Sequence, residues 1–267
     1  MRLALAQITS TPNPAENRNL VADYVGRAAE AGAEVVVFPE ATMACFGVPL
    51  APIAEPLDGP WATAVSDIAA RHGVVVVAGM FTPAPDGRVF NTVLVTGGGQ
   101  RTAYNKIHLF DAFGFAESRT VAPGETPLVI RAGGASGELP LGVATCYDVR
   151  FPELFRALAD DGAVAVLLPA SWGSGPGKRE QWELLVRARA LDSTCWVLAC
   201  GQADPAASGR ATKAGVPTGI GYSLVADPYG RVVKELGAAP DLLVVDIDAE
   251  TVTTARREIP VLANRRL

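Results

Sequence analysis

Three places in the sequence put a reactive side chain directly after a short apolar run that is typical of a β-strand. Glu40, Lys106 and Cys146 each occupy such a position. Catalytic groups often lie beyond the carboxyl ends of strands in open α/β sheets. A thiol, a carboxylate and an ammonium could together hydrolyse an amide, because that reaction needs a nucleophile, a proton carrier and donors for the developing oxyanion. Taken alone, Glu40 would more often be a solvated turn residue or a helix cap.

Cys146 differs from the other cysteines in its C-terminal neighbours. Polar and charged residues come directly after it, and a helix is expected to open near Pro152, which would place the thiol on a strand-to-helix elbow. The amides and the helix end there would favour a thiolate. The remaining cysteines are interpreted as small buried apolar residues, as most free cysteines are: Cys45, Cys195 and Cys200.

The scarcity of histidine decides which group could act as the base. His72 ends a predicted helix, and His108 is better explained as a structural hydrogen-bonding residue at the edge of the site. If neither is the base, a carboxylate must be, and Glu40 has the best position. Nearby carboxylates would raise the pKa of the Cys146 thiol, whereas Lys106 and the elbow would lower it. The sequence leaves the direction of that shift open.

The composition excludes several classes of protein. The chain has 267 residues, of which 49% are hydrophobic and 19% charged, and its net charge is −5. These values are typical of a globular protein and exclude a disordered chain. Because the acidic excess provides no basic face, we expect no nucleic-acid partner. The longest apolar runs, 73–81 and 162–170, are far shorter than the roughly 20 residues of a membrane span, so we expect no membrane association.

Signals for cofactors and for export are also missing from the sequence. It contains no phosphate-binding loop, no G-x-G-x-x-G motif after a strand, and only two histidines and four cysteines without zinc-ligand spacing. We therefore expect no metal and no cofactor. The N-terminus lacks the apolar core and cleavage site of a signal peptide, and the cysteines are too few for a disulfide scaffold. These features predict a cytoplasmic protein with reduced thiols.

Short β-branched runs alternate with helical patterns along most of the chain. We predict strands at 2–8, 34–38, 74–81, 89–95, 101–105, 139–145, 164–168, 196–200, 222–226, 232–236 and 242–247. We predict helices at 14–32, 61–72, 151–160 and 178–191. No linker divides the chain, so 1–267 is expected to form a single domain. The mixture of crossovers and hairpins favours α/β layers built on mixed sheets.

Three motifs in a fixed order carry a resemblance to a known family. They are Phe-Pro-Glu at 38–40, Asn-Lys-Ile-His-Leu at 105–109 and Cys-Tyr-Asp-Val-Arg-Phe-Pro-Glu at 146–153. The motifs, and the intervals of 66 and 40 residues between their reactive side chains, resemble the nitrilase (carbon–nitrogen hydrolase) superfamily. The likeness covers nearly the whole chain and is strongest to the branch of ω-amidases and deaminated-glutathione amidases. It implies a four-layer α-β-β-α sandwich that forms a homodimer through its outer helices.

The same resemblance implies roles for four side chains. Cys146 is the nucleophile, Glu40 the general base and Lys106 the cation beside the tetrahedral oxyanion. A second glutamate of the family, which orients the substrate and the lysine, corresponds to Glu117 in the Phe-Ala-Glu-Ser segment at 115–118. Ordinary amide chemistry agrees with these roles, since Cys146 would attack the carbonyl while Glu40 carried the proton to the leaving ammonia.

Further candidates would contact the substrate. The backbone N–H of Tyr147 would join Lys106 in holding the oxyanion. Ser171 and Trp172 belong to a Pro-Ala-Ser-Trp segment that resembles a pocket-lining segment of the family. Trp172 and Phe113 are each either core or pocket wall, and the sequence does not separate these alternatives.

Arg150 has two interpretations. The favoured one is structural: Asp148 and Arg150 flank the elbow and pair locally to hold the turn, because charges are rarely buried unpaired. In the other, Arg150 or Arg119 grips a substrate carboxylate bidentately. By the resemblance, the stretch 111–114 is shorter than in the ω-amidases, which leaves the identity of the substrate open.

The predicted function is hydrolysis of a small linear amide, with an ω-amide favoured, to an acid and ammonia through a cysteine thioester. The expected partners are a small-molecule amide, water and a second copy of the chain. One alternative is a nitrilase that uses the same residues on a nitrile, and another is acyl transfer from the same thioester to an amine. A third is a non-catalytic binding or assembly protein on this fold, although the presence of Glu40, Lys106, Glu117 and Cys146 argues against it.

Overall fold

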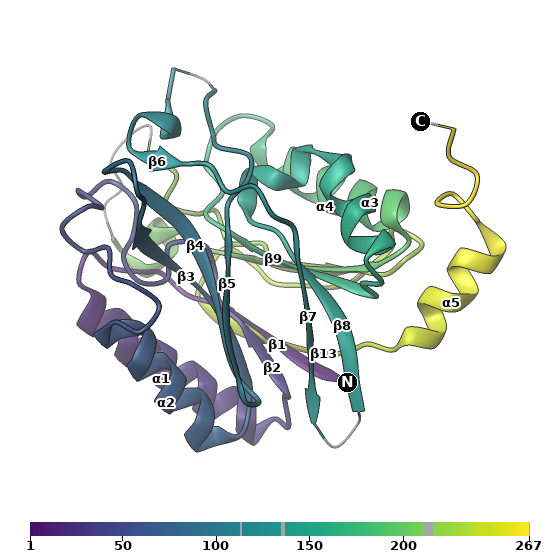
Figure 1. Cartoon of the computed structure of the whole chain (residues 1–267), viewed down its shortest axis with the longest axis horizontal. Coiled ribbons are helices and arrows are strands. Elements are labelled where there is room, and N and C mark those ends of the chain that lie inside the picture. Colours follow the sequence, from purple (N-terminus) through teal and green to yellow (C-terminus); the bar gives the residue numbers. More distant parts are fainter. Residues whose placement is uncertain (113, 135–136, 211–215, 267) are drawn as a thin grey trace.

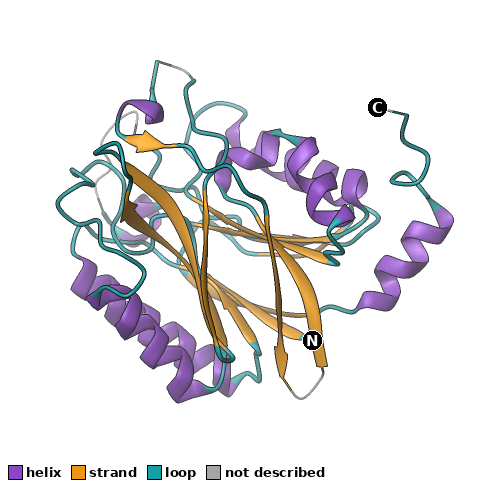
Figure 2. Cartoon of the chain, viewed as in Figure 1, coloured by secondary structure: helices purple, strands orange, loops and turns teal. Residues whose placement is uncertain are grey.

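Two mixed β-sheets lie face to face between two pairs of helices in the computed structural model of the chain (Figure 1, Figure 2). The structure describes residues 1–112, 114–134, 137–210 and 216–266. Helices α1 and α2 lie against the outer face of one sheet, and α3 and α4 lie against the outer face of the other (Figure 1). This architecture confirms the expected α-β-β-α sandwich with mixed sheets.

The first sheet has the order β13-β1-β2-β3-β4-β5, with β6 paired to β4. Its strands are β1 Arg2–Gln7, β2 Val35–Val37, β3 Val75–Pro83, β4 Val89–Gly97, β5 Gln100–Asn105, β6 Val121–Ala122 and β13 Asp241–Asp246. The neighbours β1, β2 and β3 are parallel, whereas β4, β5 and β13 join the sheet by antiparallel pairing.

The second sheet has the order β12-β11-β10-β9-β8-β7. Its strands are β7 Leu128–Gly134, β8 Gly137–Val143, β9 Ala165–Ala170, β10 Trp196–Gly201, β11 Leu224–Ala226 and β12 Val232–Glu235. The strands β8, β9 and β10 are parallel, and antiparallel strands flank them on both sides. The helices are α1 Pro14–Glu30, α2 Pro60–His72, α3 Pro152–Asp160, α4 Lys178–Ser193 and α5 Ala249–Glu258.

Both faces of β1 carry apolar side chains, which explains why the first sheet is covered on both faces. Along β1, Leu3 and Leu5 belong to the core between the sheets, whereas Ala4 and Ala6 belong to the core beneath α1 and α2. Successive side chains of a strand point to opposite faces, so one apolar run serves both cores. The small alanines lie on the face where the helices approach, and the larger leucines fill the space between the sheets.

Helix boundaries follow local signals in the sequence. The Asn13 side chain accepts a hydrogen bond from the Ala15 N–H at 3.0 Å, and Pro14 occupies the first position of α1. Gly73 ends α2 with φ of +66°, in the left-handed region that glycine adopts without steric cost. These caps fix the ends of two helices that cover the first sheet.

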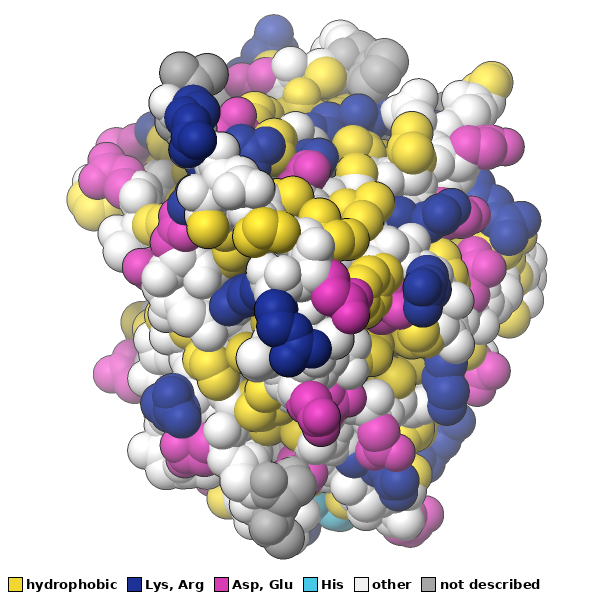
Figure 3. Space-filling view, turned by 90° about the vertical axis from the view of Figure 1, so that its right-hand side faces the viewer, with side chains coloured by type: hydrophobic (Ala, Val, Ile, Leu, Met, Phe, Trp, Pro, Cys, Tyr) yellow, Lys and Arg dark blue, Asp and Glu magenta, His cyan; other side chains and the backbone are white. Residues whose placement is uncertain are grey.

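Every predicted strand and helix has a counterpart in the structure, and two strands and one α-helix of the described residues were not anticipated. They are β6, β7 and α5. Helix α5 extends along the side of the molecule toward the C-terminus (Figure 1). No helix in the described part of the chain is both long and apolar enough to cross a membrane. On the face that includes α5, acidic and basic side chains are interspersed with apolar ones (Figure 3).

Candidate active site

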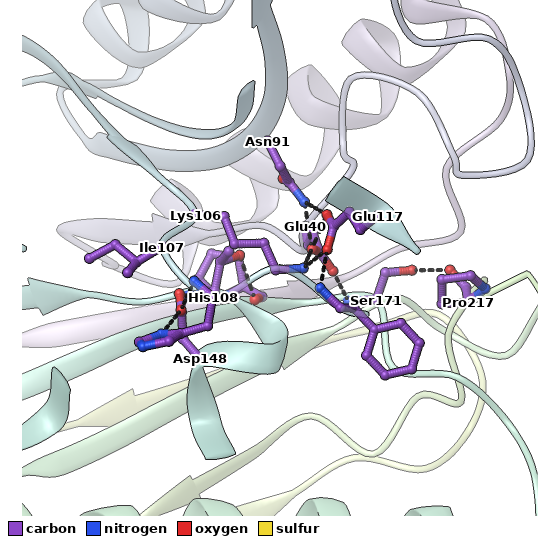
Figure 4. A network of polar contacts seen from close by, with 12 residues as sticks. Glu40, Asn91, Lys106, Ile107, His108, Glu117, Asp148, Ser171 and Pro217 are labelled. Carbon is purple, nitrogen blue, oxygen red and sulfur yellow. Dashed lines mark hydrogen bonds and ion pairs between the residues drawn. The ribbon is translucent and has the colours of Figure 1, made fainter. Parts of the chain in front are cut away.

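The structure brings Glu40, Lys106 and Glu117 into one buried cluster (Figure 4). Glu40 follows β2, Lys106 follows β5, and Glu117 opens a short 3-10 helix at Glu117–Arg119. The Lys106 Nζ atom lies 2.9 Å from Glu40 Oε1 and 3.0 Å from Glu117 Oε2, and all three side chains are almost fully buried. Cys146, which follows β8, lines the same cavity as these three residues.

The two carboxylates differ in how many of their hydrogen-bond acceptor positions are occupied. Glu117 accepts from Asn91 Nδ2 and Lys106 Nζ on Oε1, and from Lys106 Nζ and the Phe110 N–H on Oε2. A carboxylate has about four acceptor positions, so those of Glu117 are filled. Glu40 accepts from Lys106 and Asn91 on Oε1, and from the Ser171 N–H at 2.9 Å on Oε2. One position on Glu40 Oε2 therefore remains for another donor.

Charge compensation sets the ionisation of the cluster. Burial lowers the pKa of Lys106, but the charges of Glu117 and Glu40 more than offset this effect and hold that pKa well above its usual value. Burial raises the pKa of Glu117, whereas the Lys106 charge and the Phe110 N–H lower it more, so this pKa lies below its usual value. Lys106 is thus an ammonium and Glu117 a carboxylate at neutral pH.

The Cys146 thiol is buried at a strained elbow. Its backbone φ is +46°, in the left-handed region that side-chain-bearing residues rarely adopt. Burial raises the pKa of the thiol well above its usual range, and the charge of Glu40 raises it further, while Lys106 acts in the opposite direction. The question that the sequence left open is thereby answered, since the resting thiol is protonated at neutral pH. Its proton must be removed by a base, and Glu40 is a carboxylate that lines the same cavity and whose charge acts on the thiol.

Asp148 ties the segment that carries Lys106 to the elbow that carries Cys146. Its Oδ2 accepts from the Tyr104 hydroxyl at 2.7 Å and from the Thr145 N–H at 2.8 Å. Its Oδ1 contacts the His108 N–H at 3.1 Å and His108 Nδ1 at 2.7 Å (Figure 4). The His108 ring also stacks on the Phe151 ring, with centroids 3.7 Å apart. His108 therefore has the structural hydrogen-bonding position that its place in the sequence suggested.

Replacing Asp148 with alanine is expected to lower the free energy of unfolding by about 3 kcal/mol, because buried donors on Tyr104 and Thr145 would lose their acceptor. Urea denaturation of the purified variant would measure this change. Asp86→Ala is the matched control, since Asp86 is an exposed carboxylate paired with Arg88, and it should hardly alter the urea midpoint. Equal midpoints for the two variants would contradict the structural role of Asp148.

A cavity of about 220 Å³ opens beside the cluster. Glu40, Lys106, Glu117 and Cys146 line it together with Tyr147, Ser171 and Trp172. Apolar side chains form much of the remaining wall: Phe46, Leu50, Phe110, Phe115, Val216 and Pro217. Such a mostly apolar hollow with a few convergent polar groups is typical of a small-molecule site.

The structure corrects the favoured interpretation of Arg150. Its guanidinium donates to Gln181 Oε1 at 2.8 Å and lies over the Trp172 ring, 5.2 Å from the centroid, and so it does not pair with Asp148. Asp148 bonds instead to uncharged donors and to His108. The reason is that Asp148 points toward the end of β5, whereas Arg150 lines the cavity.

Other sequence candidates have distinct places. Trp172 forms part of the cavity wall, and its Nε1 donates a hydrogen bond to the Lys178 carbonyl at the start of α4. Ser171 contributes its N–H to Glu40, while its hydroxyl donates to the Pro217 carbonyl at 2.6 Å. Arg119 is exposed and is not among the cavity-lining residues. Phe113 lies outside the described residues.

Three contributors to the site were missed in the sequence. Asn91, within β4, is buried and donates to both carboxylates. Its only signal was an amide side chain inside a largely apolar strand. Lys178 opens α4 and lines the cavity, and Phe110 supplies both a ring to the wall and an N–H to Glu117. Across the described ranges, no group of three or more His, Cys, Asp or Glu side chains is arranged to hold a metal ion.

Fold and cavity together place the chain among α-β-β-α sandwich enzymes with a thiol just beyond the end of a strand, here β8. The family described as Carbon-nitrogen hydrolase matches residues 2–257. The chain therefore belongs to the carbon–nitrogen hydrolase family, and the expected resemblance is confirmed.

Individual proteins similar to this chain are consistent with its membership of this family. A hydrolase of Mycobacterium tuberculosis is 55% identical over 99% of this chain and 95% of its own length. The deaminated glutathione amidase of Escherichia coli O157:H7 is 33% identical over 100% of this chain and 97% of its own. Among solved structures, a glutamate-to-glutamine mutant of the amidase from Nesterenkonia sp. AN1 is 30% identical with a TM-score of 0.79, covering 97% of this chain and 98% of that one. Its active-site cysteine carries the product of Michael addition of acrylamide.

Proposed function

We propose that the protein is an amidase that hydrolyses a small linear amide to a carboxylic acid and ammonia through a thioester on Cys146. The observation that carries this proposal is the convergence of a protonated thiol, a carboxylate with one open acceptor position and an ammonium on one cavity. The amidases among the relatives support an amide substrate, and the acrylamide adduct in one of them supports a reactive cysteine.

The reaction begins at the thiol of Cys146. Glu40 takes the thiol proton as sulfur bonds to the amide carbon, and the π electrons of the carbonyl move to oxygen. Glu40 then gives the proton to nitrogen, the C–N bond breaks, and ammonia leaves a thioester behind. Glu40 next takes a proton from water as the hydroxyl adds to the thioester carbon. The C–S bond breaks, the acid departs, and the proton returns to sulfur.

Lys106 and the backbone of Tyr147 stabilise the oxyanion in this proposal. Lys106 lines the same cavity as Cys146, so the positive charge of its ammonium would stabilise the oxyanion that forms there. Tyr147 lies in the first turn of the 3-10 helix Cys146–Arg150, where opening N–H groups have no partner within the helix. Glu117 holds Lys106 in place and is not available as a base, because its acceptor positions are filled.

The cationic wall of the cavity favours an amide that carries a carboxylate at its far end, which is the chemistry of an ω-amide. Arg150 and Lys178 both line the cavity. Burial lowers the pKa of Lys178, and the charge of Arg150 lowers it further, so the two cations lie close enough to repel each other. An incoming carboxylate would relieve this repulsion, and a guanidinium can bind it bidentately.

Replacing Arg150 with glutamine is expected to raise the KM for a short ω-amide with a terminal carboxylate by about 10- to 100-fold, because a charged hydrogen bond is lost. The KM for a neutral amide of equal length should hardly change. Ammonia release at varied substrate concentration measures both values. Arg119→Gln is the matched control, since that arginine is exposed and is not a cavity-lining residue.

The same assay tests the substrate class directly. Equal KM changes for the acidic and neutral amides, or an effect of Arg119→Gln like that of Arg150→Gln, would contradict the carboxylate subsite. Faster ammonia release from an aliphatic nitrile than from any amide in the panel would show a nitrilase instead. A product that forms only with an added amine acceptor would show acyl transfer.

We also infer that the protein is a homodimer whose interface includes α4. Leu184 on this helix is 66% exposed and Leu191 is 44% exposed, which is unusual for large apolar side chains on one helix. Leu184→Glu is therefore expected to shift the species from dimer to monomer in sedimentation velocity. Val233→Glu, at an exposed apolar residue on β12, is the control and should leave the dimer intact. A monomeric wild-type protein would rule out the inference.

A further inference from the structure

We propose that Asn91 is a positioning residue that makes Oε2 of Glu40 the proton-accepting atom, by occupying Oε1 together with Lys106. This inference rests on the proposed role of Glu40 as the general base. Asn91 touches neither the thiol nor the substrate in this scheme, so its effect on the reaction passes through the two carboxylates. No other uncharged side chain in the described part of the chain donates to both Glu40 and Glu117.

The placement of Asn91 is specific. It lies in β4, next to the edge strand β5 that leads to Lys106, and its side chain is almost fully buried. Its Nδ2 donates to Glu40 Oε1 at 2.8 Å and to Glu117 Oε1 at 3.0 Å (Figure 4). One amide group therefore joins a residue that follows β2 to a residue of a 3-10 helix far away in the sequence.

The chemistry of the amide fixes its orientation. The two carboxylates present only acceptors, so the NH₂ group must face them, and a flipped amide would place its oxygen against two anionic oxygens. As a consequence of this orientation, Asn91 Oδ1 is buried without a hydrogen-bond partner among the described residues. A buried acceptor without a partner is unfavourable for folding. The orientation of Asn91 is therefore better explained by its effect on the carboxylates than by its own hydrogen bonding.

The occupancy of Glu40 follows from these contacts. Each carboxylate oxygen accepts about two hydrogen bonds, and Oε1 already accepts from Lys106 and Asn91. Oε2 accepts from the Ser171 N–H, which leaves it one acceptor position. Cys146 and Glu40 line the same cavity, and in this proposal the open position on Oε2 is the one that receives the thiol proton.

Loss of Asn91 changes both the geometry and the charge of the cluster. Oε1 would gain an open position, so the carboxylate could rotate or receive the proton on the wrong oxygen. Donors to a carboxylate favour its ionised form, and the hydrogen bond from Asn91 is one of the contacts that lower the pKa of Glu117, so loss of Asn91 raises that pKa. The charged and titratable groups that share the cavity with these carboxylates are Lys106 after β5, Cys146 at the elbow, Tyr147, Arg150 and Lys178. All of these groups remain when Asn91 is replaced, so the direction of the shift is upward.

The test compares the pH profiles of the wild-type enzyme with those of Asn91→Asp and Asn91→Ser, using ammonia release from a short amide. We expect kcat to fall by about 10- to 100-fold, as for a modest displacement of a reacting group, with KM changed by less than about 3-fold. The acidic limb of kcat/KM should move to higher pH in both variants. Asn91→Asp keeps the shape of the side chain but adds a carboxyl group, whereas Asn91→Ser adds no carboxyl group but is smaller. An effect common to both variants therefore cannot come from the added carboxyl group or from the changed shape alone.

Thr96→Val is the matched control. Thr96 is a buried polar residue of the same strand whose hydroxyl lies 2.7 Å from that of Ser66, away from the cavity. Its loss should destabilise the fold but leave kcat and the acidic limb unchanged. An unshifted limb in both Asn91 variants, an equal shift in Thr96→Val, or loss of the folded state in both Asn91 variants would overturn the inference. A fully active Glu40→Gln enzyme would instead overturn the proposed base, which separates the two failures.

Discussion

Replacing Cys146 with alanine is expected to abolish ammonia release, by at least about 10⁴-fold in kcat, because the thioester cannot form without the sulfur. Neither Lys106 nor Glu40 can substitute for the nucleophile, since each is held in the ion-pair cluster. The fold should be retained, because the strained φ of the elbow is imposed by the surrounding chain and the lost side chain is small. Ammonia assays and circular dichroism of the purified variant would measure activity and fold.

Cys45→Ala is the matched control for this experiment. Cys45 is partly buried and does not line the cavity, so its replacement removes a thiol without touching the site. It should keep near wild-type activity. Mass spectrometry after brief incubation with substrate should detect an acyl group on the wild-type chain and none on Cys146→Ala. Substantial turnover by Cys146→Ala in a folded state would exclude thioester catalysis.

The fold was largely predictable because its strands are short, apolar and separated by recognisable helices. The run at β1 shows the clearest signal, since both of its faces are apolar, as a sheet between two layers requires. Two elements were missed for physical reasons. β7 contains Arg131 and ends in Gly133 and Gly134, so it lacks a continuous apolar pattern, and α5 buries only Val252 and Ala255.

The site was predictable only where the reactive residue types stand at strand ends. Glu40, Lys106 and Cys146 stand there in the sequence, but their distances depend on two sheets meeting, which no local pattern encodes. Asn91 illustrates the difference, because one of its partners follows β2 and the other opens the 3-10 helix Glu117–Arg119, and its role appears only when the donors to each oxygen are counted. Arg150 was misjudged because nearness to Asp148 in the sequence favoured a local pair, whereas their side chains face different surroundings.

Replacing Glu40 with glutamine is expected to reduce kcat by about 10³-fold or more near neutral pH, which is within the range for removing a general base. The raised pKa of the Cys146 thiol makes this loss large, because the nucleophile is protonated and needs a base in every turnover. The remaining activity should increase as the pH rises, since hydroxide can then remove the thiol proton. A pH series of kcat/KM for the wild type and the variant would show this difference.

Glu117→Gln and Glu55→Gln are the comparison variants for the Glu40→Gln experiment. Glu117 has its acceptor positions filled by Asn91, Lys106 and the Phe110 N–H, so its replacement should disturb Lys106 without creating a rate that rises with pH in the same way. Glu55 accepts from the N–H groups at the start of α2 and is not a cavity-lining residue, so Glu55→Gln should remain active. A mild defect in Glu40→Gln combined with an inactive Glu117→Gln would transfer the base to Glu117. The donor count argues against that outcome, because only Glu40 retains an acceptor position from which a proton can be carried between sulfur and nitrogen.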